Sequence, residues 1–473
     1  MTSEEFAKPQ RSCAGILFDA MGLDSLYRSA PDVKLLCAQR FVRLFAYGAS
    51  TLVLVSFLRE LQTSQTLIGL FMTLTLGGDI AISFLLALFA DGMGRRATLA
   101  LGAILMTASG LVFASSDNYW ILLAAAILGV ISPSGNEIGP FRAVEESIIA
   151  HLNTSTHLSD IYAWYSLSGT AGTAFGIMTC GWVIHHLHQV LSKPLLEAYR
   201  LVFVAYSAVG VVKFVLVLLL SRAVEAEVEV EEPTQSETSP LLGEREESTK
   251  PAQTRRTQTR RTQTRRGLLP NVSKHSIPVV ISLCILFALD AFASGLAPLS
   301  WVTYFFKSHY NIEEGRLGSI FFVTSIISAC STIVASFLAK RFGNVKTMVF
   351  THLPSAVFLA LIPIPNDAHW SILFLALRAC TQSMDVAPRS AFLATILQPQ
   401  ERTVILGLVN VVKTSAQSMG PLITGVLADS NYFYISFVCA GSLKACYDLG
   451  LLAVFKNHEV DRKKVTAKND PEE

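Results

Sequence analysis

Residues 67–96 read LIGLFMTLTLGGDIAISFLLALFADGMGRR, and this segment indicates the class of protein to which the chain belongs. Up to residue 90 it is a run of apolar and small side chains with a single charge, Asp79. About 20 such residues in a helix span the hydrocarbon core of a bilayer. The run then stops at a charged turn, Asp91–Arg96. We predict one transmembrane helix over 67–90, followed by a short connection at the membrane surface.

The same pattern recurs along the whole chain. Of its 473 residues, 51% are hydrophobic and 16% are charged, and the mean hydropathy is +0.45. Soluble chains average about 25% charged residues, so the composition excludes an ordinary soluble domain. Apolar blocks of membrane-spanning length occupy 40–59, 67–90, 97–115, 119–139, 161–186, 199–221, 277–306, 317–339, 346–364, 369–394, 404–428 and 431–455. The sequence therefore predicts an all-α membrane protein with twelve transmembrane helices in two six-helix halves.

These blocks divide the chain into five segments. We expect an N-terminal tail (1–39), a first six-helix half (40–221), a linker (222–275), a second half (276–456) and a C-terminal tail (457–473). The linker begins acidic, at Glu225, and ends basic, with TRRTQ repeated over 254–263. Dense charge with few apolar residues predicts disorder. Its arginines either contact anionic lipid or form part of a solvated tether.

The distribution of Lys and Arg predicts the orientation in the membrane. Short connections on one side hold more of these residues, beginning with Arg95 and Arg96, than the facing loops do. Basic loops stay cytosolic, so both termini and the linker are expected in the cytosol. An acidic dileucine pattern at 237–242 favours a vacuolar over a plasma membrane without deciding between them.

The two halves match each other in sequence. RLFAYGAS from Arg43 aligns with DAFASGLA from Asp290, and the later segments follow at a nearly constant offset. The matched glycines are Gly48 with Gly295, Gly69 with Gly318, Gly94 with Gly343, Gly176 with Gly420 and Gly181 with Gly425. Six helices per repeat give both halves the same orientation, with a substrate site between them near the midplane.

The turn DGMGRR resembles the loop motif of the major facilitator superfamily, which joins the second and third helices. The resemblance covers the chain apart from its tails and linker, and it implies that family's fold. It also implies that Asp91, Gly94, Arg95 and Arg96 form a cytosolic gating loop that latches the halves in one state. Gly94 permits the turn, and Asp91 is expected to accept hydrogen bonds from the N-terminus of a neighbouring helix.

Charges inside the predicted spans are the candidates for function, because an ionisable group at the midplane is costly and usually has a partner or a task. The candidates for cavity or coupling roles are Arg43, Asp79, Glu137, Asp290, Arg378 and Asp385. Arg43 and Asp290 hold equivalent places in the first and seventh helices. We predict that they form, or alternate in forming, an ion pair that gates substrate or proton movement; the alternative is a static pair that sets the packing. Arg43 also lies close enough to the start of its span to reach the interface.

For each of the other charged residues we predict a role or a partner. Glu137 and Asp385 precede matched prolines, and they are either proton carriers or ion-paired hinges. Arg378 is expected to meet an anionic group of the substrate. The partner of Asp79 is Lys213 or Lys413. Finally, Lys444 and Asp448 are four residues apart on one helix and are expected to neutralise each other.

These features predict a secondary active transporter that moves a small solute by alternating access and is coupled to protons. The alternative is a non-transporting membrane sensor or scaffold on the same fold. The sequence has no nucleotide-binding loop of the GxxxxGK[ST] type and no constellation of catalytic residues, so we expect neither ATP-driven pumping nor an enzyme. The expected partners are the solute, protons and membrane lipid. We expect a monomer without a cofactor, a bound metal or nucleic acid.

Overall fold

A computed structural model describes residues 23–129, 131, 140–153, 158–225, 276–397 and 401–469, and these residues form helices and short connections. The helices of the first half are α2 (Leu23–Arg28), α3 (Pro31–Glu60), α4 (Gln65–Met93), α5 (Arg95–Ser115), α6 (Tyr119–Gly129), α7 (Pro140–Leu152), α8 (Leu158–His185) and α9 (Leu195–Leu218). A π-helical turn, η1 (His186–Val190), extends α8, and a 3-10 turn, η2 (Arg222–Val224), follows α9.

The second half is built in the same way. Its helices are α10 (Ile277–Leu296), α11 (Leu299–Tyr310), α12 (Glu314–Phe342), α13 (Asn344–Leu361), α14 (Ala368–Thr381), α15 (Val386–Ile396), α16 (Arg402–Asp429) and α17 (Phe433–Asn469). Two of the predicted spans are broken. α10 and α11 meet at Pro298, and α14 and α15 are separated by a turn that contains Asp385.

The predicted spans coincide with these helices to within a few residues at most ends. One difference is that α3 begins at Pro31, inside the predicted N-terminal tail, because Pro at the first helical position starts a helix readily. In the described residues, seven helices are long and apolar enough to cross a membrane. Twelve crossings therefore stay a prediction, while the all-helical membrane fold is confirmed. Residues 226–275, most of the predicted linker, lie outside the described part of the chain.

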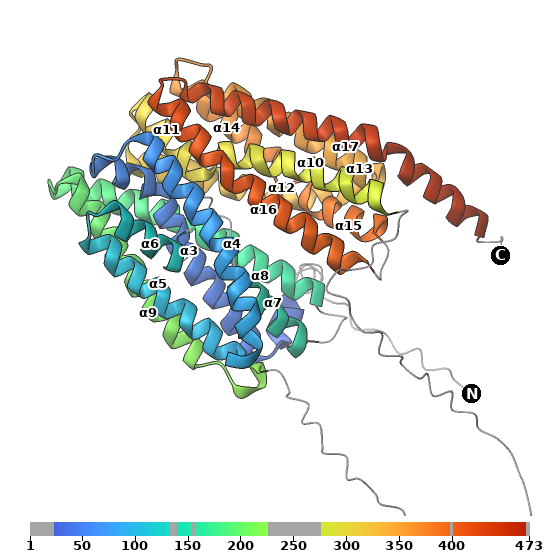
Figure 1. The fold of residues 1–473 in the computed structure, drawn as a ribbon, viewed down its shortest axis with the longest axis horizontal. Coiled ribbons are helices and arrows are strands. Elements are labelled where there is room, and N and C mark those ends of the chain that lie inside the picture. Colours follow the sequence, from blue (N-terminus) through green and yellow to red (C-terminus); the bar gives the residue numbers. More distant parts are fainter. Residues whose placement is uncertain are drawn as a thin grey trace, which may run out of the picture.

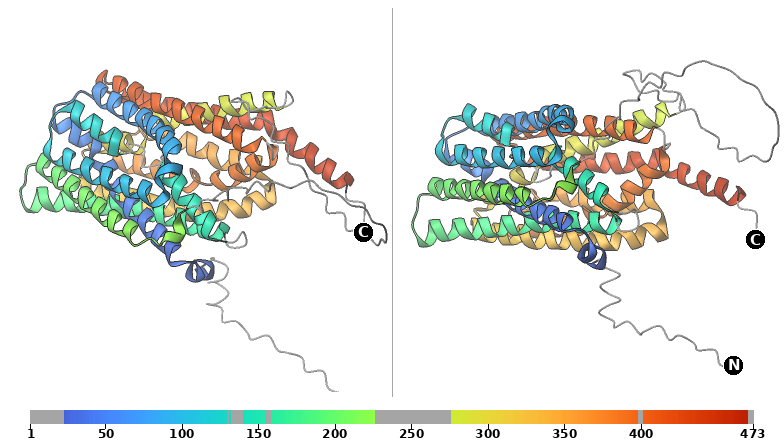
Figure 2. Two further views of the ribbon diagram at one scale, coloured as in Figure 1. Left: turned by 60° about the horizontal axis from the view of Figure 1, so that its bottom comes forward. Right: turned by 90° about the horizontal axis from the view of Figure 1, so that it is seen from below.

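Each half forms its own bundle, as Figure 1 shows, with the first half in blue to green and the second in yellow to red. The start of α3 and the end of α17 lie at the same end of the molecule. Figure 2 shows the two bundles lengthwise, with their long helices running between the same two ends. Large apolar side chains such as Phe84, Ile285 and Phe350 are exposed, as lipid-facing residues must be.

The sequence repeat appears as matching geometry. Gly94 and Gly343 stand before α5 and α13, and both have a positive φ, of 84° and 89°. A side chain is strained there, which explains glycine at both turns. Equivalent turns thus begin the third helix of each half.

Paired glycines also bring the two halves together. Gly181 of α8 packs against Gly318 of α12, and Gly69 of α4 packs against Gly425 of α16. A Cβ on Gly181 would lie 2.3 Å from the carbonyl oxygen of Glu314, a distance that no packed structure tolerates. Small residues allow such close backbone approach in membranes. The two contacts are equivalent under the repeat, which supports the alignment of the halves.

Polar contacts close one end of the bundle. The Asp429 carboxylate, at the end of α16, accepts hydrogen bonds from the backbone N–H groups of Gln65 and Thr66 at 2.9 and 2.8 Å. It thereby caps the N-terminus of α4, where the helix dipole favours an anion. At the same end, the Tyr199 hydroxyl of α9 donates to Glu314 at 3.0 Å. The hydrogen bonds that join the halves in the described residues lie at this end, and the halves diverge toward the other (Figure 1).

The glycine contacts predict opposite effects of one substitution at two places on α4. In Gly69→Ala the new Cβ would lie 2.5 Å from the carbonyl oxygen of Pro421, so the closed end must separate, at a cost of about 1–3 kcal/mol. Gly77 has nothing within 4 Å, so Gly77→Ala should stabilise the helix by about 0.5–1 kcal/mol. Thermal unfolding in detergent measures both. Equal shifts in Tm would contradict this account of the interface.

Candidate functional site

A cavity of about 450 Å³ lies within the second half, between the helices that follow the linker. Helices α10 to α17 all contribute to its wall. Most of the lining is polar or small, and the ionisable side chains on it are Asp290, His352, Arg378, Asp385, Arg389, Lys413 and Lys444. A polar cavity in this setting is unusual, because the surrounding helices otherwise present apolar side chains to lipid.

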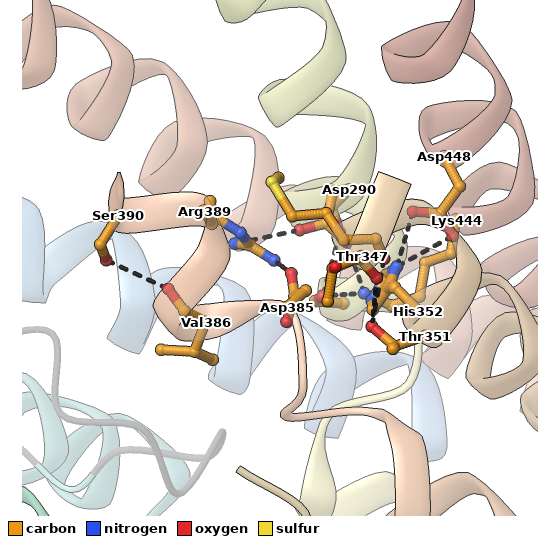
Figure 3. Close-up of polar contacts among 12 residues, drawn as sticks. Asp290, Thr347, Thr351, His352, Asp385, Val386, Arg389, Ser390, Lys444 and Asp448 are labelled. Carbon is orange, nitrogen blue, oxygen red and sulfur yellow. Dashed lines mark hydrogen bonds and ion pairs between the residues drawn. The ribbon is translucent and has the colours of Figure 1, made fainter. Parts of the chain in front are cut away.

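Asp290 stands at the centre of the ionic contacts in this cavity (Figure 3). Its carboxylate accepts a hydrogen bond from Lys444 Nζ at 2.6 Å, and Arg389 Nη1 lies 3.8 Å from its other oxygen. Lys444 also donates to Ser294 at 2.8 Å. Arg389 in turn pairs with Asp385, one helical turn earlier. One carboxylate thus links α10, α15 and α17.

A second ionic contact lies beside the first. His352 Nδ1 of α13 is 3.0 Å from both carboxylate oxygens of Asp448, and both residues are buried. The prediction that Lys444 and Asp448 neutralise each other is therefore wrong. Lys444 and Asp448 lie on the same helix, but α10 and α13 supply each with a closer partner.

Two cations of the cavity wall differ from the others. Arg378 of α14 has a buried Nε without a hydrogen-bond partner. Lys413 of α16 lies 5.5 Å from the ring centroid of Phe287. Within the described part of the chain, neither side chain forms an ion pair or a hydrogen bond. Each faces the cavity without a carboxylate beside it.

The predicted ion pair between Arg43 and Asp290 is wrong. Arg43 binds Glu145 of α7 instead, through two hydrogen bonds of 2.7 Å, and Tyr165 donates to the same carboxylate at 2.5 Å. Arg43 and Glu145 are both almost fully buried, so Arg43 does not reach the interface. The bidentate geometry satisfies the guanidinium inside the first half. Arg43 and Asp290 thus occupy equivalent places, but each finds its partner within its own half.

Asp79 has no partner in the described residues. The side chain is 2% exposed, and neither carboxylate oxygen has a hydrogen-bond partner. Neither proposed partner reaches it: Lys213 lies over the ring of Phe141, and Lys413 over Phe287. An ionised carboxylate without a partner costs several kcal/mol or more in such surroundings.

Two of the predicted elements are only partly described. Glu137 lies outside the described residues, and the side chain of Asp91 is not described either. In the turn that Asp91 begins, the backbone N–H groups of Arg95 and Arg96 donate to Glu225 at 2.7 and 3.1 Å. Glu225 therefore caps the N-terminus of α5. It belongs to the predicted linker, and its position seven residues after the end of α9 gives no signal for this contact.

The structure adds two residues that the sequence did not single out. Glu145 lies on α7, between the predicted spans 119–139 and 161–186 and inside neither of them. His352 is a lone histidine inside an apolar span. Arg43 was a signal for a buried acid in the first half, because a cation inside a predicted span needs a counter-charge.

Comparisons with known proteins agree with this architecture. The family model described as Major Facilitator Superfamily matches residues 36–298 and 283–472. A protein of Saccharomyces cerevisiae, described as uncharacterized membrane protein YJR124C, is 38% identical over 446 residues, which cover 92% of this chain and 96% of the yeast protein.

Two solved structures show the same fold at low sequence identity. A bacterial homologue of the human lysosomal transporter Spinster, inward-facing and unoccupied, has a TM-score of 0.63 at 14% identity, over 90% of this chain and 97% of that one. A D-xylose-proton symporter has a TM-score of 0.62 at 14% identity, over 89% and 96%. The family match extends over nearly the whole chain, and the likeness in fold agrees with it. The chain therefore belongs to the Major Facilitator Superfamily, a family of membrane transporters.

Proposed function

We propose that this protein is a secondary active transporter that moves a small solute by alternating access and is coupled to protons. The observation that carries the proposal is the polar cavity in the second half, with ion pairs in its wall. A scaffold, one form of the alternative from sequence, has no need of such a cavity. Ionisable groups inside a membrane commonly mark the path of a substrate or an ion.

The state of the bundle supports alternating access. One end is held shut by contacts that join the halves, such as Asp429 with the N-terminus of α4. The halves diverge toward the end at which α3 starts and α17 ends (Figure 1). With both termini in the cytosol, as the Lys and Arg distribution predicts, this is an inward-facing state. The opposite state requires that the polar contacts at the closed end break.

Asp79 is the group we propose to carry the proton. Its carboxylate is buried and has no partner in the described residues, so the protonated form fits this environment and the ionised form does not. Tyr206 of α9, whose hydroxyl is likewise buried without a partner, lies near enough to interact with it. A conformation that exposes Asp79 to water would release the proton. Proton binding would thus be tied to the position of α4.

The transport proposal is tested with purified protein in liposomes. The vesicles are incubated in the small-molecule fraction of a cell extract, with and without a pH gradient, and their contents are analysed by mass spectrometry. We expect at least one solute to accumulate above protein-free vesicles, and the gradient to increase its accumulation. Contents that match protein-free vesicles under both gradient directions would rule transport out.

Asp79→Asn tests the proton carrier. Asparagine has nearly the shape of the neutral acid, so Tm should stay within a degree or two of the wild type or rise. Flux of the solute found above should lose its response to the pH gradient. Asp117→Asn is the matched control, because Asp117 is an exposed acid in the connection before α6. If Asp79→Asn transported with an unchanged pH response, Asp79 would not be the carrier.

A double-mutant cycle tests the pair at the centre of the cavity. Lys444→Met and Asp290→Asn should each destabilise the protein by at least about 2 kcal/mol, because each leaves the other partner buried without its closest counter-charge. The double variant should be more stable than the sum of the single effects predicts. Thermal unfolding gives the three values. Strict additivity would show that the contact contributes nothing to folding.

A further inference from the structure

We propose that the solute is an anion bearing a carboxylate or phosphate group, and that Arg378 and Lys413 bind it in the cavity of the second half. This inference rests on the proposed transport function and names its substrate class. Its basis is a mismatch between the positive and negative side chains that line the cavity.

The cavity wall carries more cations than it can neutralise. Four cationic side chains line it, Arg378, Arg389, Lys413 and Lys444, against two carboxylates, Asp290 and Asp385. Lys444 is bound to Asp290, and Arg389 lies between the two carboxylates. Both acids are therefore already engaged. Arg378 and Lys413 are the two cations of the wall that form no ion pair with a described residue.

Arg378 has the chemistry of an anion receptor. Its guanidinium presents a planar fork of donors that matches a carboxylate or a phosphate. The Nε atom is buried, yet it donates to no described residue. A cation held in this way inside a membrane protein costs free energy, and an anion that binds it recovers that cost. α14 thus presents to the cavity a donor group that the fold itself does not use.

Lys413 supplies the second positive charge from a different helix. It lies over Phe287, a contact that orients the ammonium without neutralising it. Around the two cations the wall offers neutral hydrogen-bonding groups, among them Gln382 and Gln417. No further carboxylate of the described lining is free to bind a cationic solute. The volume of about 450 Å³ is in the range of sites for small molecules.

The experiment measures the charge preference of the cavity without knowledge of the solute. Ser325, on the cavity wall, is changed to Cys, and the thiol is modified with the anionic sulfonatoethyl or the cationic trimethylammonium-ethyl methanethiosulfonate. Mass spectrometry of the peptide that contains residue 325 gives each rate separately from the native cysteines. The anionic-to-cationic rate ratio, divided by that of free 2-mercaptoethanol, reports the potential at the thiol.

We expect this normalised ratio to be at least about five. That is the rate factor that corresponds to the interaction of one charge on the reagent with one charge on the protein a few ångströms away in water. Arg378→Gln and Lys413→Gln should each lower it by a similar factor. Arg378→Lys, which keeps the charge, should not. Arg341→Gln is the matched control, because Arg341 is exposed at the end of α12 and does not line the cavity.

A ratio near one, or one that both glutamine variants leave unchanged, would overturn the anion proposal. This measurement needs no flux, so it stands even if the liposome experiment finds no transport. Conversely, a transported solute that proved neutral or cationic would overturn the substrate class while leaving transport established.

Discussion

The cost of a charge inside the bilayer is the constraint on which the rest of this structure depends. An ionisable side chain buried there pairs with an opposite charge, takes its neutral form or binds a charged ligand. Each outcome is present in the described residues. Arg43 with Glu145 and Asp290 with Lys444 are paired within their halves. Asp79 has no hydrogen-bond partner there, and Arg378 and Lys413 form no ion pair with a described residue. The unpaired groups are the ones to which we assign the proton and the solute.

The internal repeat gives the protein two halves of similar structure, and the cost of buried charge applies to both. Matched glycines let α8 pack on α12 and α4 pack on α16, so the interface between the halves is nearly symmetric. The charges break that symmetry. The first half contains the buried ion pair of Arg43 with Glu145 and an acid without a described partner, Asp79. The second half contains a cavity whose wall carries more cations than carboxylates. This difference is the basis of our proposal that the first half binds the proton and the second half binds the solute.

The sequence predicted the helices well because apolar blocks of membrane length have few alternative structures. It also singled out glycines at packing positions, because only small residues allow close backbone contact: members of the matched pairs Gly69/Gly318 and Gly181/Gly425 meet as Gly69 with Gly425 and Gly181 with Gly318. It could not predict the ion pairs. The partner of each charged side chain depends on how its helix is rotated about its own axis. The four-residue spacing of Lys444 and Asp448 therefore gave a wrong prediction. Glu145 was missed because it follows a break in the helix, and Glu225 because its contact with α5 is purely tertiary.

The central claim is that the two halves close alternately at opposite ends of the bundle. Spin labels at Glu60 and Tyr432 report on the closed end of the bundle, and labels at Met93 and Phe342 report on the opposite end. All four side chains are exposed, so each position can carry a label. Distance distributions by double electron–electron resonance in liposomes, at acidic and at neutral pH, measure both ends. The account predicts that a longer distance at one end appears together with a shorter distance at the other. Two distances that stay fixed, or that lengthen together, would contradict it.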